Sequence, residues 1–256
     1  MNKQLEGKVA VITGGAQGVG FGIAQEFIDN GASVVLTGRR RGALDEAVGR
    51  LGSKSSGVVA DVSKLSDMEA MFKEVIARHG RLDTVVANAI TNANGPLGTI
   101  TEAQWDHTFN TNAKGVLFSI QPALPLMKPG GTIVIIGSTA SVSPPPSMSL
   151  YGGAKAAVRC MVRCWIQDIK GSGIRINVLC SGAVDTPSLR SALEAASGVA
   201  KVDAAVKAMG EGNPLGRLAD PREIGKTAVF LASDASSFIT GVELFVDGGM
   251  VQVSGA

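Results

Sequence analysis

Short apolar, β-branched runs alternate with amphipathic helical segments along almost the whole chain, and this alternation restricts the fold more than any other feature. The runs are typical of strands buried on both faces, and they cover residues 8–13, 33–37, 57–60, 84–87, 132–136, 175–179 and 242–246. Helical patterns fill the intervals at 18–30, 43–51, 66–79, 102–127, 150–170 and 221–231, although Pro122 and Pro125 must bend or interrupt the end of the fourth. The alternation predicts an α/β fold with one doubly wound parallel sheet of about seven strands and helices on both faces.

The alternation breaks once, between residues 181 and 214, a stretch too long for an ordinary connection. It contains a helix-like segment at 191–209 and follows a predicted strand at its carboxyl end, where doubly wound sheets bind ligands. We therefore expect residues of about 184–213 to form a substrate lid. Neither a linker-like composition nor an internal repeat interrupts the sequence, so residues 1–256 are expected to form a single domain.

Charged residues are evenly mixed, which argues against several classes of function. The 24 basic and 22 acidic residues give a net charge of +2 without an extended basic patch, so we expect no nucleic-acid partner. No apolar run reaches the roughly 18 residues that a membrane helix needs, and the N-terminal residues contain no apolar signal-peptide core. We accordingly expect a cytoplasmic protein without a membrane partner.

The cysteines and histidines do not predict a metal site. Cys160 and Cys164 lie four residues apart on a predicted helix, but two thiolates do not complete a zinc site, and His79 and His107 are distant in the sequence. Three cysteines also provide no disulfide framework. We expect no metal and interpret the cysteines as buried, inert thiols.

A glycine-rich turn joins the first predicted strand to the first helix and reads Thr13-Gly14-Gly15-Ala16-Gln17-Gly18-Val19-Gly20. Glycines permit a tight turn and let backbone amides approach a pyrophosphate at a helix N-terminus, where the helix dipole favours negative charge. A glycine cluster alone is often a simple turn, but this one occupies the first strand–helix connection of a βαβ unit. It predicts a Rossmann-type dinucleotide site that includes Gly14, Gln17, Gly18, Val19 and Gly20.

The second predicted strand ends in Gly38-Arg39-Arg40, with no acidic residue before Asp45. NAD sites usually place a carboxylate here to bind the ribose 2′-hydroxyl. Gly38 instead leaves room, and the guanidinium of Arg39 can form paired hydrogen bonds with a 2′-phosphate beside Arg40. This pattern favours NADP(H) over NAD as the cofactor; the alternative is a solvated basic turn.

Tyr151, the only tyrosine in the chain, precedes Lys155 by four residues, so the two side chains lie on one face of a predicted helix. An ordinary tyrosine, with a pKa of about 10, is a poor base near neutrality, and a nearby ammonium would lower that value. The pair is thus a candidate for proton transfer to or from a substrate oxygen. Ser138 ends the fifth predicted strand, and Asn112 lies in the preceding helical region.

Together Asn112, Ser138, Tyr151 and Lys155 resemble the pattern of the short-chain dehydrogenase/reductase family. The resemblance covers essentially the whole chain, from Thr13-Gly14 to Val246-Asp247-Gly248-Gly249. It implies that Tyr151 is the general acid/base and that Lys155 tunes it and binds the nicotinamide ribose. Ser138 would hydrogen-bond the reacting oxygen, and Asn112 would hold a water in the proton relay.

The resemblance also implies further cofactor contacts. Asp61 and Val62 are expected at the adenine, although an aspartate before a helix is also a common cap. Thr186 is expected to reach the carboxamide end of the nicotinamide. The cofactor residues implied in this way are Asp61, Val62, Asn88, Ala89, Ile90, Gly182, Val184 and Thr186.

Three positions depart from the family pattern, and none removes a catalytic group. The family's Asn-Asn-Ala-Gly appears here as residues 87–90, its Pro-Gly as Ser181-Gly182, and its Tyr-x-Ala-Ser-Lys as Tyr151-Gly152-Gly153-Ala154-Lys155. Ile90 puts a side chain where glycine usually lets the cofactor approach, and Ser181 is expected to loosen the turn before the lid. Two glycines in a first helical turn cost local stability.

The expected substrate wall comprises residues 90–97, 139–150 and the lid. Its apolar members are Pro144, Pro145, Pro146, Met148, Leu189 and Met209, and it has few charges besides Asp185 and Arg190. These apolar walls predict a neutral, moderately hydrophobic ketone or secondary alcohol, while the triple proline is equally consistent with a stiff surface loop. The candidate substrate contacts are Ser138, Pro145, Met148, Tyr151 and Leu189.

The sequence therefore predicts an NADP(H)-dependent oxidoreductase that transfers a hydride between nicotinamide and a carbonyl or alcohol. One alternative is another reaction on the same scaffold, such as a 3-oxoacyl-carrier-protein-type reductase or a sugar dehydrogenase. The other is a non-catalytic NADP-binding module. The resemblance also implies a homotetramer built from the two long helices and the last strand, with Trp105 and Trp165 in either the core or an interface.

Overall fold

Seven short strands rich in valine and isoleucine pair side by side, all in parallel, into one sheet of the computed structural model. The structure describes residues 3–253, so Met1 and Asn2 of the N-terminal segment discussed above lie outside it. The strands are β1 (Val9–Thr13), β2 (Ser33–Gly38), β3 (Ser55–Val59), β4 (Thr84–Ala87), β5 (Thr132–Ser138), β6 (Arg175–Ser181) and β7 (Glu243–Val246). Their order in the sheet is β3-β2-β1-β4-β5-β6-β7. From β1 the chain builds toward one edge through β2 and β3, then crosses back to place β4 beside β1 and builds toward the other edge. The predicted doubly wound sheet is confirmed, although β3 begins two residues earlier than expected.

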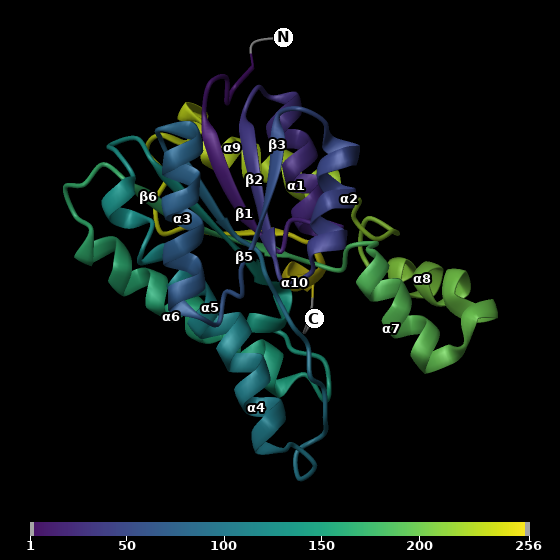
Figure 1. Cartoon of the computed structure of the whole chain (residues 1–256). Coiled ribbons are helices and arrows are strands. Elements are labelled where there is room, and N and C mark those ends of the chain that lie inside the picture. Colours follow the sequence, from purple (N-terminus) through teal and green to yellow (C-terminus); the bar gives the residue numbers. More distant parts are fainter. Residues whose placement is uncertain (1–2, 254–256) are drawn as a thin grey trace.

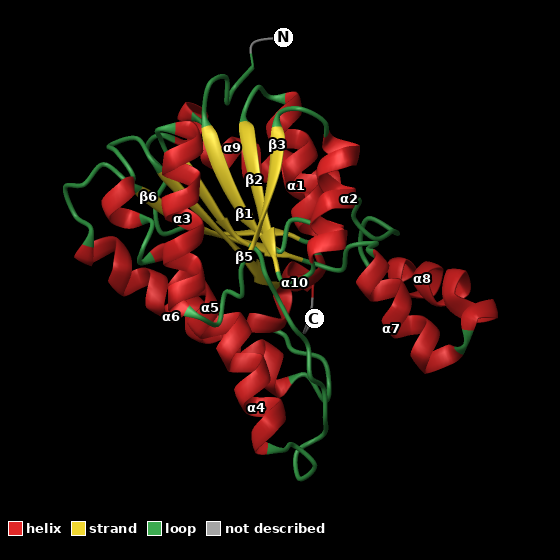
Figure 2. Cartoon of the chain, in the orientation of Figure 1, coloured by secondary structure: helices red, strands yellow, loops and turns green. Residues whose placement is uncertain are grey.

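Helices cover both faces of the sheet (Figures 1 and 2). On one face lie α1 (Gly18–Asp29), α2 (Arg41–Leu51) and α9 (Pro221–Ala232). On the other lie α3 (Leu65–His79), α5 (Gly115–Ile120) and α6 (Ser149–Asp168). The remaining helices are α4 (Glu102–Phe109), α7 (Pro187–Ser197), α8 (Val202–Glu211) and α10 (Met250–Val253). The chain enters β1 from the upper N-terminus in Figure 1, so the carboxyl ends of the strands point downward.

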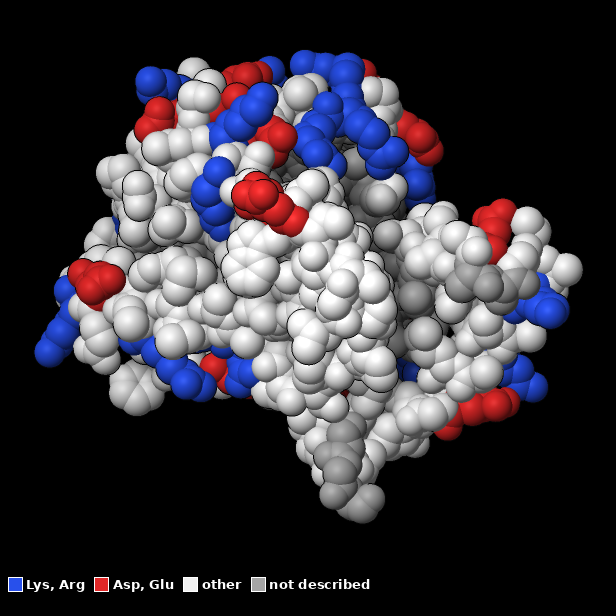
Figure 3. Space-filling view, turned by 90° about the horizontal axis from the view of Figure 1, so that it is seen from below, with Lys and Arg blue, Asp and Glu red and all other residues white. Residues whose placement is uncertain are grey.

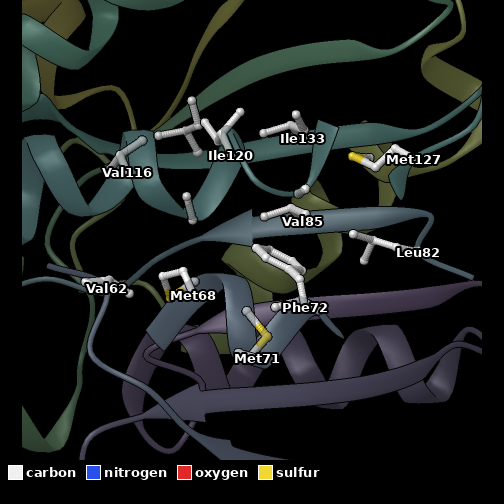
Figure 4. Close-up of a cluster of buried hydrophobic side chains, with 14 of the residues drawn as sticks. Val62, Met68, Met71, Phe72, Leu82, Val85, Val116, Ile120, Met127 and Ile133 are labelled. Carbon is white, nitrogen blue, oxygen red and sulfur yellow. The ribbon is translucent and has the colours of Figure 1, made fainter. Parts of the chain in front are cut away.

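Two buried clusters, one on each face of the sheet, form the core. In the cluster of Figure 4, Phe72 and Met68 of α3 pack beside Val85 of β4, opposite Ile120 of α5. Each side chain of this size contributes roughly 1.5–3 kcal/mol when it is removed from water. The clusters therefore hold the sheet rigid, and the carboxyl ends of its strands keep a fixed spacing.

The predicted continuous helix over 102–127 is wrong. The structure has α4, then a π-helical turn η1 (Asn110–Lys114), then α5, which ends at Ile120. Pro122 has no N–H to donate to the carbonyl of residue 118, so the helix cannot continue. A short 3₁₀ turn, η2 (Leu124–Leu126), follows with a proline in it.

The segment after β6 forms two helices rather than one, so the predicted helix over 191–209 is also wrong. Thr186 caps α7, its Oγ1 accepting from the N–H of Leu189 at 3.2 Å. The chain turns at Gly198, whose φ of 83° suits glycine, and α8 then begins at Val202. The α7–α8 pair projects from the rest of the chain at the right of Figure 1.

Two of the three cysteines contradict the expectation of buried thiols. Cys160 and Cys164 are exposed on α6, because that helix turns Ala154, Val158 and Val162 toward the sheet instead; Cys180 is buried in β6. Within residues 3–253 no cluster of His, Cys, Asp and Glu could hold a metal ion, and no helix there is long and apolar enough to span a membrane.

The two tryptophans differ in their surroundings. Trp165 packs partly buried against the core cluster beneath α6. Trp105 is half-exposed and stacks on Phe109, their ring centres 4.2 Å apart. Trp165 thus borders the core with part of its side chain exposed, and Trp105 lies on the surface of α4.

Candidate active site

A cavity of about 720 Å³ opens at the carboxyl ends of the strands, where the sequence placed the cofactor. Nearly every predicted cofactor residue lines it, namely Gly14, Gln17, Gly18, Val19, Gly20, Gly38, Arg39, Arg40, Asp61, Val62, Asn88, Ala89, Ile90, Tyr151, Gly182, Val184 and Thr186. Figure 3 views the molecule from this end and shows a hollow between the α7–α8 projection, at the right, and the rest of the chain. Charged side chains gather near the edges of that view, and its centre is nearly free of them.

The glycine turn at the start of α1 requires glycine for two physical reasons. Gly14 and Gly18 have φ angles of 63° and 54°, a region that side chains disfavour. A Cβ on Gly20 would lie 2.4 Å from the carbonyl oxygen of Gly14 and 2.5 Å from the side-chain nitrogen of Asn88. The turn is therefore packed against itself and leaves its outer side to the cavity.

Asn88, at the end of β4, holds this turn in place. Its Nδ2 donates to the carbonyl oxygens of Thr13 and Gly14 at 2.9 and 3.0 Å. In return, Thr13 Oγ1 accepts from the backbone N–H groups of Asn88 and Ala89 at 3.0 and 3.1 Å. These bonds fix the ends of β1 and β4 together at the mouth of the cavity.

Two arginines follow β2 on the cavity wall. The guanidinium of Arg40 donates to Gln17 Oε1 at 3.3 Å, so it reaches across to the glycine turn. Burial raises the pKa of Asp61, but hydrogen bonds from Ser63 and the charge of Arg39 outweigh it and hold that pKa below its ordinary value. The carboxylate of Asp61 closes a turn with Ser63 before α3, whose cap is Lys64, so Asp61 is not the cap of that helix.

The N-terminus of α2 adds an anion-binding feature to the same wall. Its first turn contains no acidic residue and its capping residue, Arg40, makes no side-chain cap bond. Ala43 and Leu44 of that turn line the cavity, as does Thr37. The buried Oγ1 of Thr37 has no hydrogen-bond partner among the described residues. The amides of the first turn of the helix and the two guanidinium groups together suit a phosphate.

Tyr151 lines the cavity, and Ser138, at the end of β5, lies beside it outside the lining. The hydroxyl of Ser138 is near enough to the phenol of Tyr151 to lower its pKa, and it accepts from the N–H of Ala140 at 3.1 Å. Lys155 is 2% exposed, and its Nζ donates to the carbonyl oxygen of Ile136 at 2.6 Å. That Nζ lies 5.9 Å from the ring centre of Tyr151.

The pKa values of this pair differ from the expectation. Burial raises the pKa of Tyr151, and the hydrogen bond from Ser138 offsets only part of the effect. Lys155 does not lower it, because this buried amine gives up its own proton before the phenol ionises. Burial also lowers the pKa of Lys155 to about 8. In the chain by itself, Lys155 therefore loses its proton at a lower pH than Tyr151 does.

Because Tyr151 is the only tyrosine, its ionisation can be followed directly by the ultraviolet difference absorbance of tyrosinate. A raised pKa means that the phenol keeps its proton to a higher pH than in a model peptide, where the value is about 10. We therefore expect a single transition with a midpoint above 10 in the purified chain. Tyr151→Phe should abolish the transition, and a midpoint below 10 would contradict the structure.

Asn112 uses both ends of its amide to fix the segment after β4. Its Oδ1 accepts from the N–H of Thr91 at 2.8 Å, and its Nδ2 donates to the carbonyl oxygen of Thr91 at 2.7 Å. The π-helical turn η1 places this fully buried side chain inward. The segment held in this way includes Ile90, which is half-exposed at the cavity wall.

Some predicted residues do not line the cavity, and others that do line it were missed. Outside the lining are Asn112, Ser138, Lys155 and the substrate candidates Pro145, Met148 and Leu189. Lining residues that the sequence analysis did not assign to the site are Ala16, Thr37, Ala43, Leu44, Ala60, Thr111, Ile136, Gly137, Ser181 and Ser188. Most of these are chain neighbours of predicted residues at the carboxyl ends of strands, which is the signal that could have found them.

The triple proline is exposed, and its segment contacts the residues after β4. The carbonyl oxygen of Ser147 accepts from the N–H of Gly95 at 2.9 Å, and Ser147 itself has a φ of 66°. Pro144, Pro145 and Pro146 thus form a surface loop at the N-terminal end of α6.

The chain is similar to known oxidoreductases over nearly its whole length. The family model described as enoyl-(acyl carrier protein) reductase matches residues 14–251. The oxidoreductase asL5 of Sarocladium schorii is 43% identical over 98% of both chains, and the short-chain dehydrogenase/reductase SDRA of Arabidopsis thaliana is 33% identical over 97% of this chain and 96% of its own. The aldohexose dehydrogenase of Thermoplasma acidophilum, solved without ligand, superposes with a TM-score of 0.92 at 26% identity, covering 100% of this chain and 98% of that one.

Proposed function

The chain belongs to the short-chain dehydrogenase/reductase family, whose oxidoreductases act on alcohol and carbonyl groups with a nicotinamide cofactor, and we propose that it is an NADP(H)-dependent reductase of neutral ketones. The observation that carries the proposal is one cavity with two chemically different ends. Arg39 and Arg40 line one end, and Tyr151, with Ser138 beside it, lines the other.

The basic end supports NADP(H) rather than NAD(H). The residues around the uncapped start of α2 supply positive charge and hydrogen-bond donors where a 2′-phosphate would lie. The glycine turn and Asn88 would hold the pyrophosphate, and Asp61 with Val62 would lie at the adenine. When bound, the cofactor supplies the hydride, and the protein supplies orientation and proton transfer.

The mechanism assigns one task to each catalytic side chain. Tyr151 gives its phenolic proton to the carbonyl oxygen during reduction, and its raised pKa keeps that proton available at neutral pH. Ser138 donates a hydrogen bond to the same oxygen and holds it beside the phenol. Lys155 would bind the nicotinamide ribose after turning from Ile136. Since both ends of the Asn112 side chain are occupied by Thr91, a relay water would be bound by the main chain of η1.

The walls support a neutral substrate. Arg190 donates to both carboxylate oxygens of Asp185, at 2.7 and 2.8 Å, and to Asp203 at 2.8 Å. The charges that the sequence singled out in the lid are therefore paired with each other and are not free to bind an ionic substrate. We propose that α7 and α8 close over the hollow as this lid, in a chain that forms one catalytic domain.

A homotetramer in the cytoplasm remains the expected working state. The exposed side of α6, with the small residues Gly153, Cys160 and Cys164, and the half-exposed Trp105 of α4 support an interface on this face. The edge strand β7 would contribute the second interface. The molecular mass of the purified chain from sedimentation tests this proposal. A tetramer needs both interfaces, a dimer needs only one of them, and a monomer would contradict both.

The proposed function is tested by a cofactor-linked activity screen with the purified chain. The panel contains neutral aromatic and aliphatic ketones, a 3-oxoacyl thioester, an enoyl thioester and aldohexoses, each with NADP(H) and NAD(H). We expect the highest kcat/KM for a neutral ketone with NADPH. Turnover confined to the thioesters or to the aldohexoses would favour the activities named for the matched family and for the Thermoplasma protein. Binding of NADPH without any turnover would indicate a non-catalytic module.

A further inference from the structure

Arg159 lies one helical turn beyond Lys155 on α6, as Lys155 lies one turn beyond Tyr151. Its side chain is only 16% exposed, and it does not line the cavity. Its Nη1 donates to both the carbonyl oxygen and the Oγ of Ser141, at 3.1 and 3.2 Å. A largely buried guanidinium is thus hydrogen-bonded to the last residue of the 3₁₀ turn η3 (Thr139–Ser141), which directly follows β5.

Ser141 in turn forms a hydrogen bond with Ser138. The Oγ of Ser141 donates to the carbonyl oxygen of Ser138 at 2.6 Å, while it accepts from Arg159. Ser138 is the residue whose own hydroxyl faces Tyr151. An unbroken chain of hydrogen bonds therefore runs from the guanidinium to the residue that holds the phenol.

The other end of this chain is anchored on the edge strand. Arg159 Nη2 donates to one carboxylate oxygen of Glu243 in β7, and Arg163 Nη2 donates to the other at 2.9 Å. Glu243 is 15% exposed; burial raises its pKa, but the two arginines outweigh that effect and keep it below its ordinary value. The guanidinium also lies 5.9 Å from the ring centre of Phe245. Arg159 is therefore held by α6, β7 and the turn after β5 together.

Resting on the proposed function, we propose that Arg159 is a positioning residue that fixes Ser138 against Tyr151 through Ser141, with Glu243 fixing Arg159. β5 ends at Ser138, where the chain leaves the sheet and loses its ladder of backbone hydrogen bonds. The hydrogen bond from Ser141 replaces that support at the residue where the reaction needs it. A displacement near 1 Å at a reacting group can cost about 100-fold in rate, so a loss on the order of tenfold is expected when the support is removed.

The test compares Arg159→Met with Arg163→Met. Both changes remove a guanidinium from Glu243, but only the first also breaks the contacts with Ser141. We expect Arg159→Met to lower kcat about tenfold while KM for NADPH stays unchanged, because Arg159 is not at the cavity. The tyrosinate transition of Tyr151 should move to higher pH, since the hydrogen bond that partly offsets burial is weakened. Arg163→Met should leave kcat and this transition unchanged.

Ser141→Ala provides a second variant that keeps the Arg159–Glu243 pair and removes only the hydroxyl link. It should move kcat and the tyrosinate transition in the same directions by smaller amounts, and it decides the question if Arg159→Met does not fold. The proposal would be overturned if Ser141→Ala, and any Arg159→Met that folds, kept the wild-type kcat and tyrosinate transition. It would also be overturned if Arg159→Met and Arg163→Met had equal effects. The tyrosinate titration needs no substrate, so it tests this inference even if the proposed ketone reduction fails.

Discussion

Replacing Tyr151 with phenylalanine is expected to lower kcat for ketone reduction by a factor on the order of 10²–10⁴, the usual contribution of a general acid. The change removes one oxygen atom and the only phenol in the chain, and Ser138 cannot replace it, since a serine hydroxyl is a far weaker acid. The ring itself remains, so the packing at the start of α6 is preserved. Steady-state kinetics with NADPH and the best ketone of the screen measure the effect.

The control for Tyr151→Phe is cofactor affinity. Tyr151 is one of many residues that line the cavity, so the dissociation constant for NADPH should change by less than about tenfold. Full turnover in the variant would refute the assigned mechanism. Loss of NADPH binding together with activity would instead show that the substitution had damaged the cavity.

Replacing Arg39 with glutamate is expected to reverse the cofactor preference. A charged hydrogen bond contributes roughly 1.5–3 kcal/mol, so kcat/KM for NADPH should fall on the order of 100-fold once a carboxylate opposes the 2′-phosphate. The value for NADH should change far less, because its ribose hydroxyl can donate to the new carboxylate. The ratio of the two kcat/KM values is the quantity to compare.

Lys73→Glu is the matched control for this change. Lys73 lies on α3, is exposed and does not line the cavity, and it is outside the first turn of α2. Its replacement changes the net charge by the same amount, so it should leave the ratio nearly unaffected. An Arg39→Glu chain with the original selectivity would show that the basic run is a solvated turn.

The positions of the strands along the chain were predictable because each is a compact apolar run between turn residues. A parallel strand is buried on both faces, so its sequence carries a strong signal even over the four residues of β4. The cofactor end of the cavity was predictable for a related reason. Its residues lie at strand ends and in one glycine turn, where local sequence determines the backbone.

Contacts between segments distant in the sequence were not predictable. The amide of Asn112 was expected to hold a water, but it forms two hydrogen bonds with the backbone of Thr91 instead. This pairing depends on the π-helical turn, which was not predicted. The pKa of Tyr151 was expected to fall because Lys155 is near in sequence. In the structure the depth of burial governs that pKa, and burial depends on the whole fold.

The π-helical turn η1 also sets the rotational phase between two helices. A helix advances about 100° with each residue, so the extra residue in such a turn rotates everything before it by that angle relative to everything after it. With the turn in place, α5 directs Val116 and Ile120 into the core. At the same time, α4 brings Nε2 of His107 to within 2.6 Å of Oγ1 of Thr91. Deleting one residue from η1 would therefore leave two intact helices that could no longer both face their partners.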